Sequence, residues 1–190
     1  EEAAAAANGQ EPGDIKVQDV DGNGVITTDD RIIYSQRPDV TFGFNNTFNY
    51  KGFDLSVFLY ARLGQWIAYD YNTTYRINAL ENGGNVDYWT PENPTNAFPR
   101  PNKSKSYTQV TYYSTLKYED GSFFKIRDIT LGYTFKPELL KHLNLSKLRV
   151  YATAKNFFTF SKIDNYDPEQ GGSISFPMTK QLVFGLNVEF

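Results

Sequence analysis

The last ten residues of the chain, Gln181–Phe190, carry the pattern that most restricts its fold. Every second position is apolar, and these positions are Leu182, Phe184, Leu186, Val188 and Phe190. The residues between them are mostly polar or small. Such alternation is typical of a β-strand with one apolar face and one wetter face. A tilted transmembrane strand has roughly 9–11 residues, but strands of a soluble sandwich alternate in the same way.

Composition excludes several functional classes. The 190 residues include 19 basic and 22 acidic side chains, and the formal charge of -3 gives no electrostatic basis for binding nucleic acid. Cysteine is absent, which excludes disulfides, thiolate metal sites and a cysteine nucleophile. There is one histidine, His142, around which we expect no Ser/His/Asp set, so the sequence does not predict an enzyme.

Aromatic residues are abundant, with 14 Tyr, 15 Phe and 2 Trp. No apolar run is long enough for a transmembrane helix, but the strands of a membrane barrel alternate and make no such runs. This composition favours either an outer-membrane barrel with large polar loops or a carbohydrate-binding β-domain.

Residues 19–30 have the spacing of a calcium-binding loop. Oxygen-bearing side chains occupy loop positions one, three, five and twelve, and position seven offers a backbone carbonyl. The expected ligands are therefore Asp19, Asp21, Asn23, Val25 and Asp30. Position twelve is Asp, whereas an EF-hand has Glu there. Dockerin-type loops also carry Asp at this position. We expect a structural calcium ion here; the alternative is an Asp/Asn/Gly-rich turn that holds no metal.

Alternation predicts four further strands. Residues 41–63 form a hairpin around Lys51-Gly52, and further strands are expected at 123–135 and 148–155, ahead of the terminal strand 181–190. Short connections alternate with long ones, and aromatic residues gather at both ends of the predicted strands. Short turns at one end, long loops at the other and two aromatic belts are typical of an outer-membrane barrel.

The strands of such a barrel have an inward face. The polar residues predicted to line the lumen, where they contact cargo or anchor a plug, are Asp54, Tyr60, Arg62, Arg127, Arg149 and Lys155. No substrate ligand is assigned among them. Five strands cannot close a transmembrane barrel, so we expect the chain to be part of a longer polypeptide that supplies the remaining strands.

Several segments resemble, in family order, the SusC/RagA-type TonB-linked outer-membrane proteins. These segments are Pro12–Arg31, Phe42–Phe48, Tyr50–Phe58, Trp89–Asn96, Asp120–Tyr133, Leu148–Tyr151, Lys155–Phe157 and Phe184–Phe190. The resemblance covers nearly the whole chain from about residue 10 onward.

The resemblance implies an all-β fold, namely the C-terminal five antiparallel strands of a 22-stranded transmembrane barrel with long extracellular loops. It further implies import of oligosaccharides or peptides across the bacterial outer membrane, with a SusD-like surface lipoprotein as lid. TonB would act through the family's N-terminal part, which this chain does not include. The alternative function is a soluble, calcium-stabilised β-sandwich that binds carbohydrate.

The expected division of the chain follows from this layout. It comprises an extracellular loop (1–40) with the calcium loop (19–30), a barrel hairpin (41–63), a long extracellular loop (64–122), a second hairpin (123–159), an extracellular loop (160–180) and the terminal strand (181–190).

Overall fold

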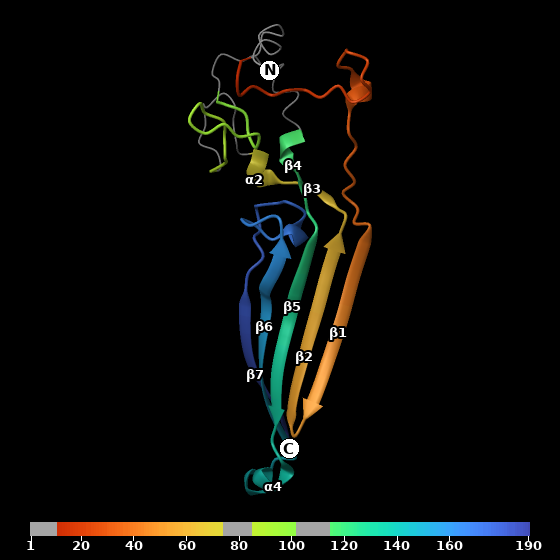
Figure 1. Cartoon of the computed structure of the whole chain (residues 1–190). Coiled ribbons are helices and arrows are strands. Elements are labelled where there is room, and N and C mark those ends of the chain that lie inside the picture. Colours follow the sequence, from red (N-terminus) through yellow and green to blue (C-terminus); the bar gives the residue numbers. More distant parts are fainter. Residues whose placement is uncertain (1–10, 74–84, 102–114) are drawn as a thin grey trace. The chain divides into compact units, whose positions relative to one another are not determined.

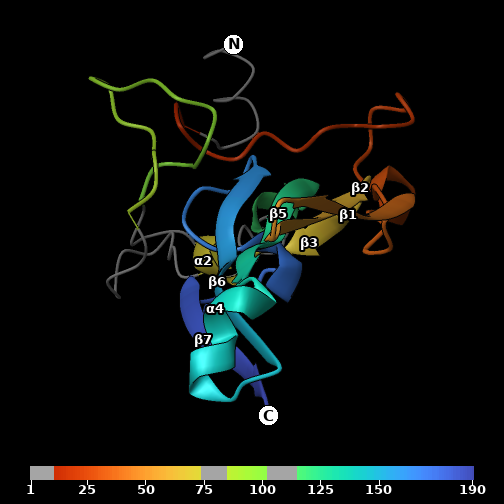
Figure 2. The ribbon, with the colours of Figure 1, turned by 90° about the horizontal axis from the view of Figure 1, so that it is seen from below.

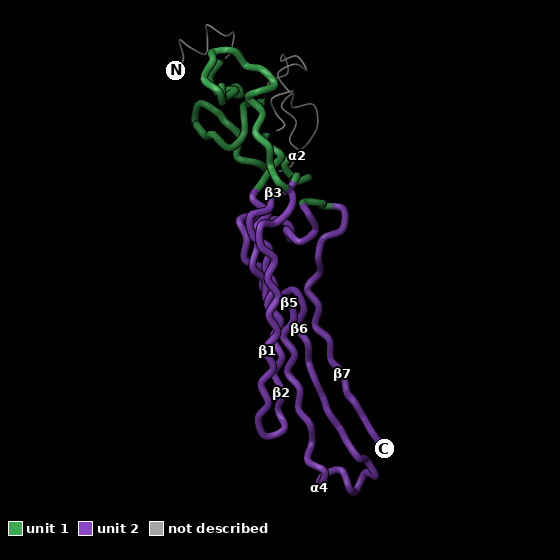
Figure 3. The backbone as a smooth tube through the Cα atoms, turned by 90° about the vertical axis from the view of Figure 1, so that its right-hand side faces the viewer, with its two compact units in different colours: residues 1–35, 68–119, 172–174 green, residues 36–67, 120–171, 175–190 purple. Residues whose placement is uncertain are grey.

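The structure is a computed structural model that describes residues 11–73, 85–101 and 115–190. The chain forms two compact units, shown in different colours in Figure 3. Unit 1 comprises residues 1–35, 68–119 and 172–174, and unit 2 comprises residues 36–67, 120–171 and 175–190.

Unit 2 is built on a five-stranded antiparallel sheet, as the sequence predicts (Figure 1). Its spatial order is β1-β2-β5-β6-β7. The strands of this sheet therefore lie side by side in the same order in which they follow one another along the chain. The strands are β1 (Val40–Tyr50), β2 (Phe53–Leu63), β5 (Phe123–Thr134), β6 (Lys147–Ser161) and β7 (Gln181–Glu189).

Short connections lie at one end of this sheet. Lys51 and Gly52 join β1 to β2 and both have positive φ (47° and 89°), as a two-residue hairpin with the twist of its strands requires. Between β5 and β6 the chain forms α4 (Pro137–Leu140) and the 3-10 helix η3 (Lys141–Leu143). Figure 2 views the molecule from the end where α4 lies. Both connections at this end of the sheet are therefore compact.

Aromatic side chains gather beside these short connections. The rings of Phe53 and Tyr133 lie 4.6 Å apart, and Phe135 meets Tyr133 edge-on at 5.1 Å. Such groups are expected where a barrel wall meets the membrane interface, because Tyr and Phe combine a large apolar ring with tolerance for partial hydration.

One face of the sheet is largely apolar, with Asn46 of β1 as a polar residue on it. The strand registers bring to it the side chains of Phe42, Phe44, Phe48, Leu55, Val57, Leu59, Ile129, Leu131, Val150, Ala152, Phe184 and Leu186. Many of these are exposed: Phe48 is 62% exposed, Phe184 74% and Leu186 65%. Besides this sheet, the described residues contain only two three-residue strands, β3 (Trp66–Ala68) and β4 (Tyr118–Asp120). No described sheet is therefore large enough to cover the face as a sandwich partner would.

The pairing is interrupted at Arg127. In the register between β2 and β5, Phe58 opposes Asp128 while Leu59 opposes Ile126, so Arg127 is an extra residue and forms a β-bulge. The register between β5 and β6 shifts at the same level, where Asn156 adopts a left-handed φ of 57°. The bulge changes which residues of β5 share a face on either side of it.

Unit 1 has little regular structure. Its described part includes the loop predicted to bind calcium (residues 19–30), the 3-10 helix η1 (Thr28–Asp30) and the short helix α2 (Asp70–Thr73). The Asn72 side-chain amide donates to Leu116 O (3.0 Å) and to Glu119 Oε1 (2.9 Å). Parts of the long segment expected over 64–122 lie outside the described residues, as does the start of the chain. No described helix has the length and hydropathy needed to cross a membrane.

Candidate functional site

The loop predicted to bind calcium is organised by its own side chains. The Asp19 carboxylate accepts hydrogen bonds from the N–H groups of Gly22 (2.8 Å) and Gly24 (2.7 Å). Asn23 Oδ1 accepts from Val25 N–H at 2.8 Å. Both glycines have positive φ (74° and 82°), a backbone conformation that residues other than glycine rarely adopt. The turn is therefore closed around the first ligand position.

Asp30 returns to the start of this loop. Its carboxylate accepts from Thr27 N–H (2.6 Å) and Val20 N–H (2.7 Å), and it completes a capping box with Thr27 at η1. These backbone donors, Thr27 first, hold the pKa of Asp30 below its usual value. One oxygen each from Asp19, Asp21 and Asp30 lies within 4.8 Å of the others. The structure thus brings together the three predicted carboxylates, with Asn23 and Val25 in the same turn.

The polar face of the sheet carries ion pairs between strands. Arg149 donates to Asp54 from Nε (2.8 Å) and Nη2 (2.5 Å), a bidentate geometry that suits guanidinium and carboxylate. Gly132 lies between them: a Cβ there would overlap both side chains. Lys155 Nζ lies 3.7 Å from Asp128 Oδ1.

Lys147 and Glu189 form a further pair at 2.8 Å. Asp54, Tyr60, Arg62, Arg149 and Lys155 belong to this face by register, and the bulge lets Arg127 contact groups on it as well. The six residues predicted to share the inward face are therefore found on one face of the sheet.

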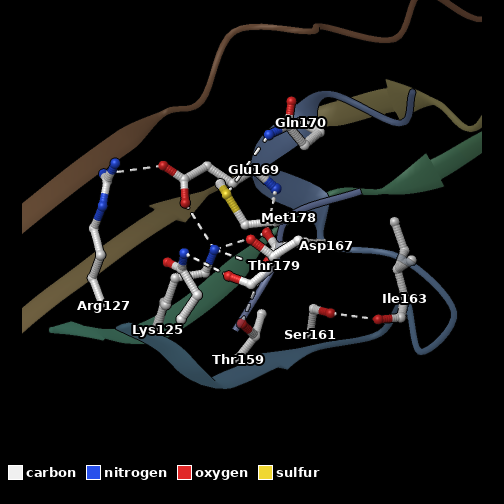
Figure 4. A network of polar contacts seen from close by, with 11 residues as sticks. Lys125, Arg127, Thr159, Ser161, Ile163, Asp167, Glu169, Gln170, Met178 and Thr179 are labelled. Atoms are coloured by element: carbon white, nitrogen blue, oxygen red, sulfur yellow. Dashed lines mark hydrogen bonds and ion pairs between the residues drawn. The ribbon is translucent and has the colours of Figure 1, made fainter. Parts of the chain in front are cut away.

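Sequence reasoning did not identify the buried Lys125 at the centre of a network on this face (Figure 4). Its side chain is 0% exposed, and Nζ donates to both carboxylate oxygens of Asp167 (2.8 and 2.7 Å) and to Glu169 Oε2 (2.7 Å). Arg127 Nη1 reaches the other oxygen of Glu169 at 3.0 Å. The only signal in the sequence was the presence of two cations in β5 and of two acids in the β6–β7 loop.

This network fixes the β6–β7 loop on the sheet. Asp167 caps the 3-10 helix η4 (Pro168–Gln170) by accepting from Glu169 N–H at 3.0 Å. A cavity of about 440 Å³ lies beside it, lined by residues of β6 and of the loop, including Thr159, Tyr166 and Met178. The loop is thus held by charge-assisted hydrogen bonds and leaves an accessible space beside β6.

A second polar contact joins Asp120, the last residue of β4, to Lys162, which directly follows β6. Asp120 accepts from Ser122 N–H at 3.0 Å, and Lys162 Nζ lies 2.9 Å from its Oδ2. Hydrogen bonds from Ser122 and Lys162 lower the pKa of Asp120 to about 2. Asp120 is therefore ionised under all ordinary conditions.

Tyr60 organises a cationic and aromatic group on the polar face. Arg62 Nε donates to Tyr60 Oη at 2.8 Å. The guanidinium carbons of Arg62 and Arg127 lie 5.6 and 5.3 Å from the centroid of the Tyr60 ring, within cation–π range. The rings of Phe58 and Phe123 lie 6.3 and 5.8 Å from that of Tyr60.

Comparisons with known proteins agree with this geometry. No family model matches the chain. It is 30% identical over its whole length to TonB-dependent receptor P3 of Formosa agariphila, covering 20% of that protein. It is 31% identical to TonB-dependent receptor SusC of Bacteroides thetaiotaomicron, over 90% of the chain and 17% of SusC.

Among solved structures, the RagAB peptide importer in its closed-closed state superposes with a TM-score of 0.69 at 28% identity. The match covers 90% of this chain and 20% of that one. The RagAB peptide transporter gives a TM-score of 0.68 at 27% identity, over 84% of this chain and 18% of that one.

The chain spans about a fifth of the length of the curated relatives it matches. These relatives are receptors and transporters, none of them named as an enzyme, and they favour the barrel over the soluble sandwich. The open five-stranded sheet, apolar on one face and polar on the other, agrees with a part of a larger barrel wall. The chain belongs to the SusC/RagA-type TonB-dependent receptors of the bacterial outer membrane and supplies five antiparallel strands of their β-barrel.

Proposed function

We propose that the protein containing this chain imports oligosaccharides or peptides across the outer membrane, and that this chain contributes barrel wall and extracellular loops. The observation that carries the proposal is the similarity of the whole chain to TonB-dependent receptors, together with the superposition on a peptide importer.

The two faces of the sheet support this role. The apolar face exposes side chains such as Phe48 and Phe184 and suits contact with lipid acyl chains. The opposite face pairs nearly all of its charges, as in Asp54–Arg149, and suits a water-filled or plugged lumen. Charges on the lipid side would carry a large desolvation cost, which explains why the sheet segregates them.

We further propose that import uses a SusD-like surface lipoprotein and energy from TonB, which would act through the N-terminal part of the full-length protein. The proposal is supported by the relation to SusC and RagAB. Uptake of labelled oligosaccharides and peptides is to be measured in cells that express the full-length protein. We expect uptake to disappear when the receptor, TonB or the SusD-like partner is deleted. Uptake that persists without the receptor would disprove import by this protein.

We propose that residues 19–30 hold a structural calcium ion. Three carboxylates converge within 4.8 Å, and mutual repulsion of this kind is relieved by a hard divalent cation. Side-chain oxygen from Asn23 and a backbone carbonyl from Val25 would complete a set of oxygen ligands. The positive φ of Gly24, at loop position six, fits the sharp turn that such loops require.

Calcium content separates this proposal from an empty turn. Full-length protein and its Asp21→Ala and Asp29→Ala variants are dialysed against calcium, and bound metal is measured by elemental analysis. Asp29 is the control because it is an acid of the same loop outside the converging set. We expect Asp21→Ala, which removes the side-chain oxygen at loop position three, to bind one calcium ion fewer than the other two proteins. Equal calcium content in all three would show that the loop holds no ion.

A further inference from the structure

Arg62 is the one strand cation on the polar face without a carboxylate partner among the described residues. The other strand cations of this face are each within ion-pair distance of an acid: Lys125, Arg127, Lys147, Arg149 and Lys155. Since a barrel wall segregates and pairs its charges, a cation left uncompensated on this face needs an explanation.

The guanidinium of Arg62 is already held in place. Nε is committed to Tyr60 Oη at 2.8 Å, and the guanidinium carbon lies 5.6 Å from the centroid of the Tyr60 ring. The two terminal nitrogens have no hydrogen-bond partner among the described residues. They form a planar fork, which matches the two oxygens of a carboxylate. Little side-chain entropy remains to be lost when such a group binds.

The surroundings of Arg62 are positively charged. Arg127 contacts the same Tyr60 ring at 5.3 Å. Together with Lys125 these residues form a group of three cations that faces only two carboxylates, Asp167 and Glu169. The excess positive charge attracts an anion.

Arg62 also lies at the end of the sheet where cargo would enter. It pairs with Thr41 and Phe123, next to the last residue of β2, and the long connections leave the sheet at this end. In outer-membrane barrels the long loops are extracellular and the short turns periplasmic. A free cation at the extracellular end meets incoming solutes before they reach the barrel interior.

We propose that Arg62, oriented by Tyr60, binds a carboxylate group of the imported cargo. The carboxylate belongs either to a peptide or to an acidic sugar of an oligosaccharide. This inference rests on the proposed import function and adds that the cargo is selected for negative charge.

Matched ligands that differ only in the carboxylate test this inference. Full-length transporter in detergent is titrated calorimetrically with N-acetyl-pentaalanine and its C-terminal amide, and with tetragalacturonate and its methyl ester. We expect at least one acid to bind wild type about tenfold more tightly than its neutral partner, as one charge-assisted bidentate pair allows. Arg62→Gln should remove this preference, and Arg62→Lys should restore part of it.

Lys155→Gln is the matched control, because Lys155 is a cation of the same face that already has an acidic partner. It should keep the preference for the acid. Equal or absent binding of acid and neutral ligand to wild type overturns the inference, as does a preference that survives Arg62→Gln. If Arg62→Gln only lowers the thermal stability of the full-length protein, its partner is a protein carboxylate and the inference is wrong. Normal TonB-dependent uptake alongside any of these results leaves the import proposal intact.

Discussion

Replacing Lys125 by Met tests how firmly the β6–β7 loop is attached to the sheet. Methionine keeps most of the length of the buried stem but removes the ammonium group that three carboxylate oxygens share. The side chains of Asp167 and Glu169 are 12% and 9% exposed, so water cannot fully replace the lost donor.

Removing one partner of a buried ion pair costs about 3–5 kcal/mol. We expect the lower end of this range, about 3 kcal/mol, since both acids keep other donors. Glu169 retains Arg127 at 3.0 Å, and Asp167 retains the Glu169 N–H at 3.0 Å and the Thr159 hydroxyl at 3.3 Å. A loss of about 3 kcal/mol from local opening raises the population of the open loop about 150-fold.

Hydrogen exchange measured by mass spectrometry on the full-length protein reads this population directly. Amides held by η4, such as that of Gly171 bonded to Pro168 O, should exchange about 150-fold faster in Lys125→Met. Lys147→Met is the control, because its pair with Glu189 is exposed and such pairs contribute roughly 0–1 kcal/mol. Unchanged exchange in Lys125→Met, or an equal increase in both variants, would refute a loop anchored by Lys125.

Three further predictions concern the sheet and its loops. Leu186→Arg places a charge on the apolar face and should make the free energy of insertion of the full-length protein into lipid vesicles less favourable by about 2–4 kcal/mol. Asn187→Arg, on the opposite face, should insert normally. Equal insertion of the two variants would contradict the assignment of the faces. Gly132→Ala should separate the ion pair that spans it and lower the urea midpoint of unfolding, whereas Gly43→Ala, whose added methyl meets only ordinary contacts, should leave the midpoint almost unchanged. Because the pKa of Asp120 is about 2 in the folded protein and roughly 3.9 in an unfolded chain, its stabilising effect should be present above about pH 4 and be lost as the pH falls through 2. Unfolding midpoints between pH 2 and 5 should therefore depend less on pH in Asp120→Asn than in wild type.

The strands could be predicted because each carries its own alternating pattern. The predicted terminal strand, 181–190, corresponds to β7 (Gln181–Glu189), and the predicted hairpin, 41–63, to β1 and β2. The strand predicted at 148–155 is longer in the structure, where β6 runs from Lys147 to Ser161. The left-handed Asn156 breaks the alternation, which hid the continuation of this strand.

The candidate sites differ in how far apart their residues lie in the sequence. The convergence of Asp19, Asp21 and Asp30 could be predicted because these residues lie within twelve consecutive positions. The network of Lys125 could not, since Asp167 follows it by 42 residues and only the fold brings them together. Arg62 was predicted to face inward. That it has no acidic partner among the described residues could not be predicted, because the sequence does not show which acids pair with the other cations.

The bulge at Arg127 has a consequence for how the wall can change in evolution. After the bulge, even-numbered residues of β5 such as Asp128 and Thr130 occupy the polar face. Before the bulge, odd-numbered residues such as Lys125 occupy it. Deleting Arg127 would remove the extra residue and restore regular alternation, in which Asp128, Ile126 and Lys125 oppose Phe58, Leu59 and Tyr60 and Lys125 stays on the polar face. A single-residue gap at the bulge should therefore be tolerated among functional homologues, whereas a gap at a regularly paired position of β5 would invert the faces of the strand beyond it. Length changes in the long connections cost little.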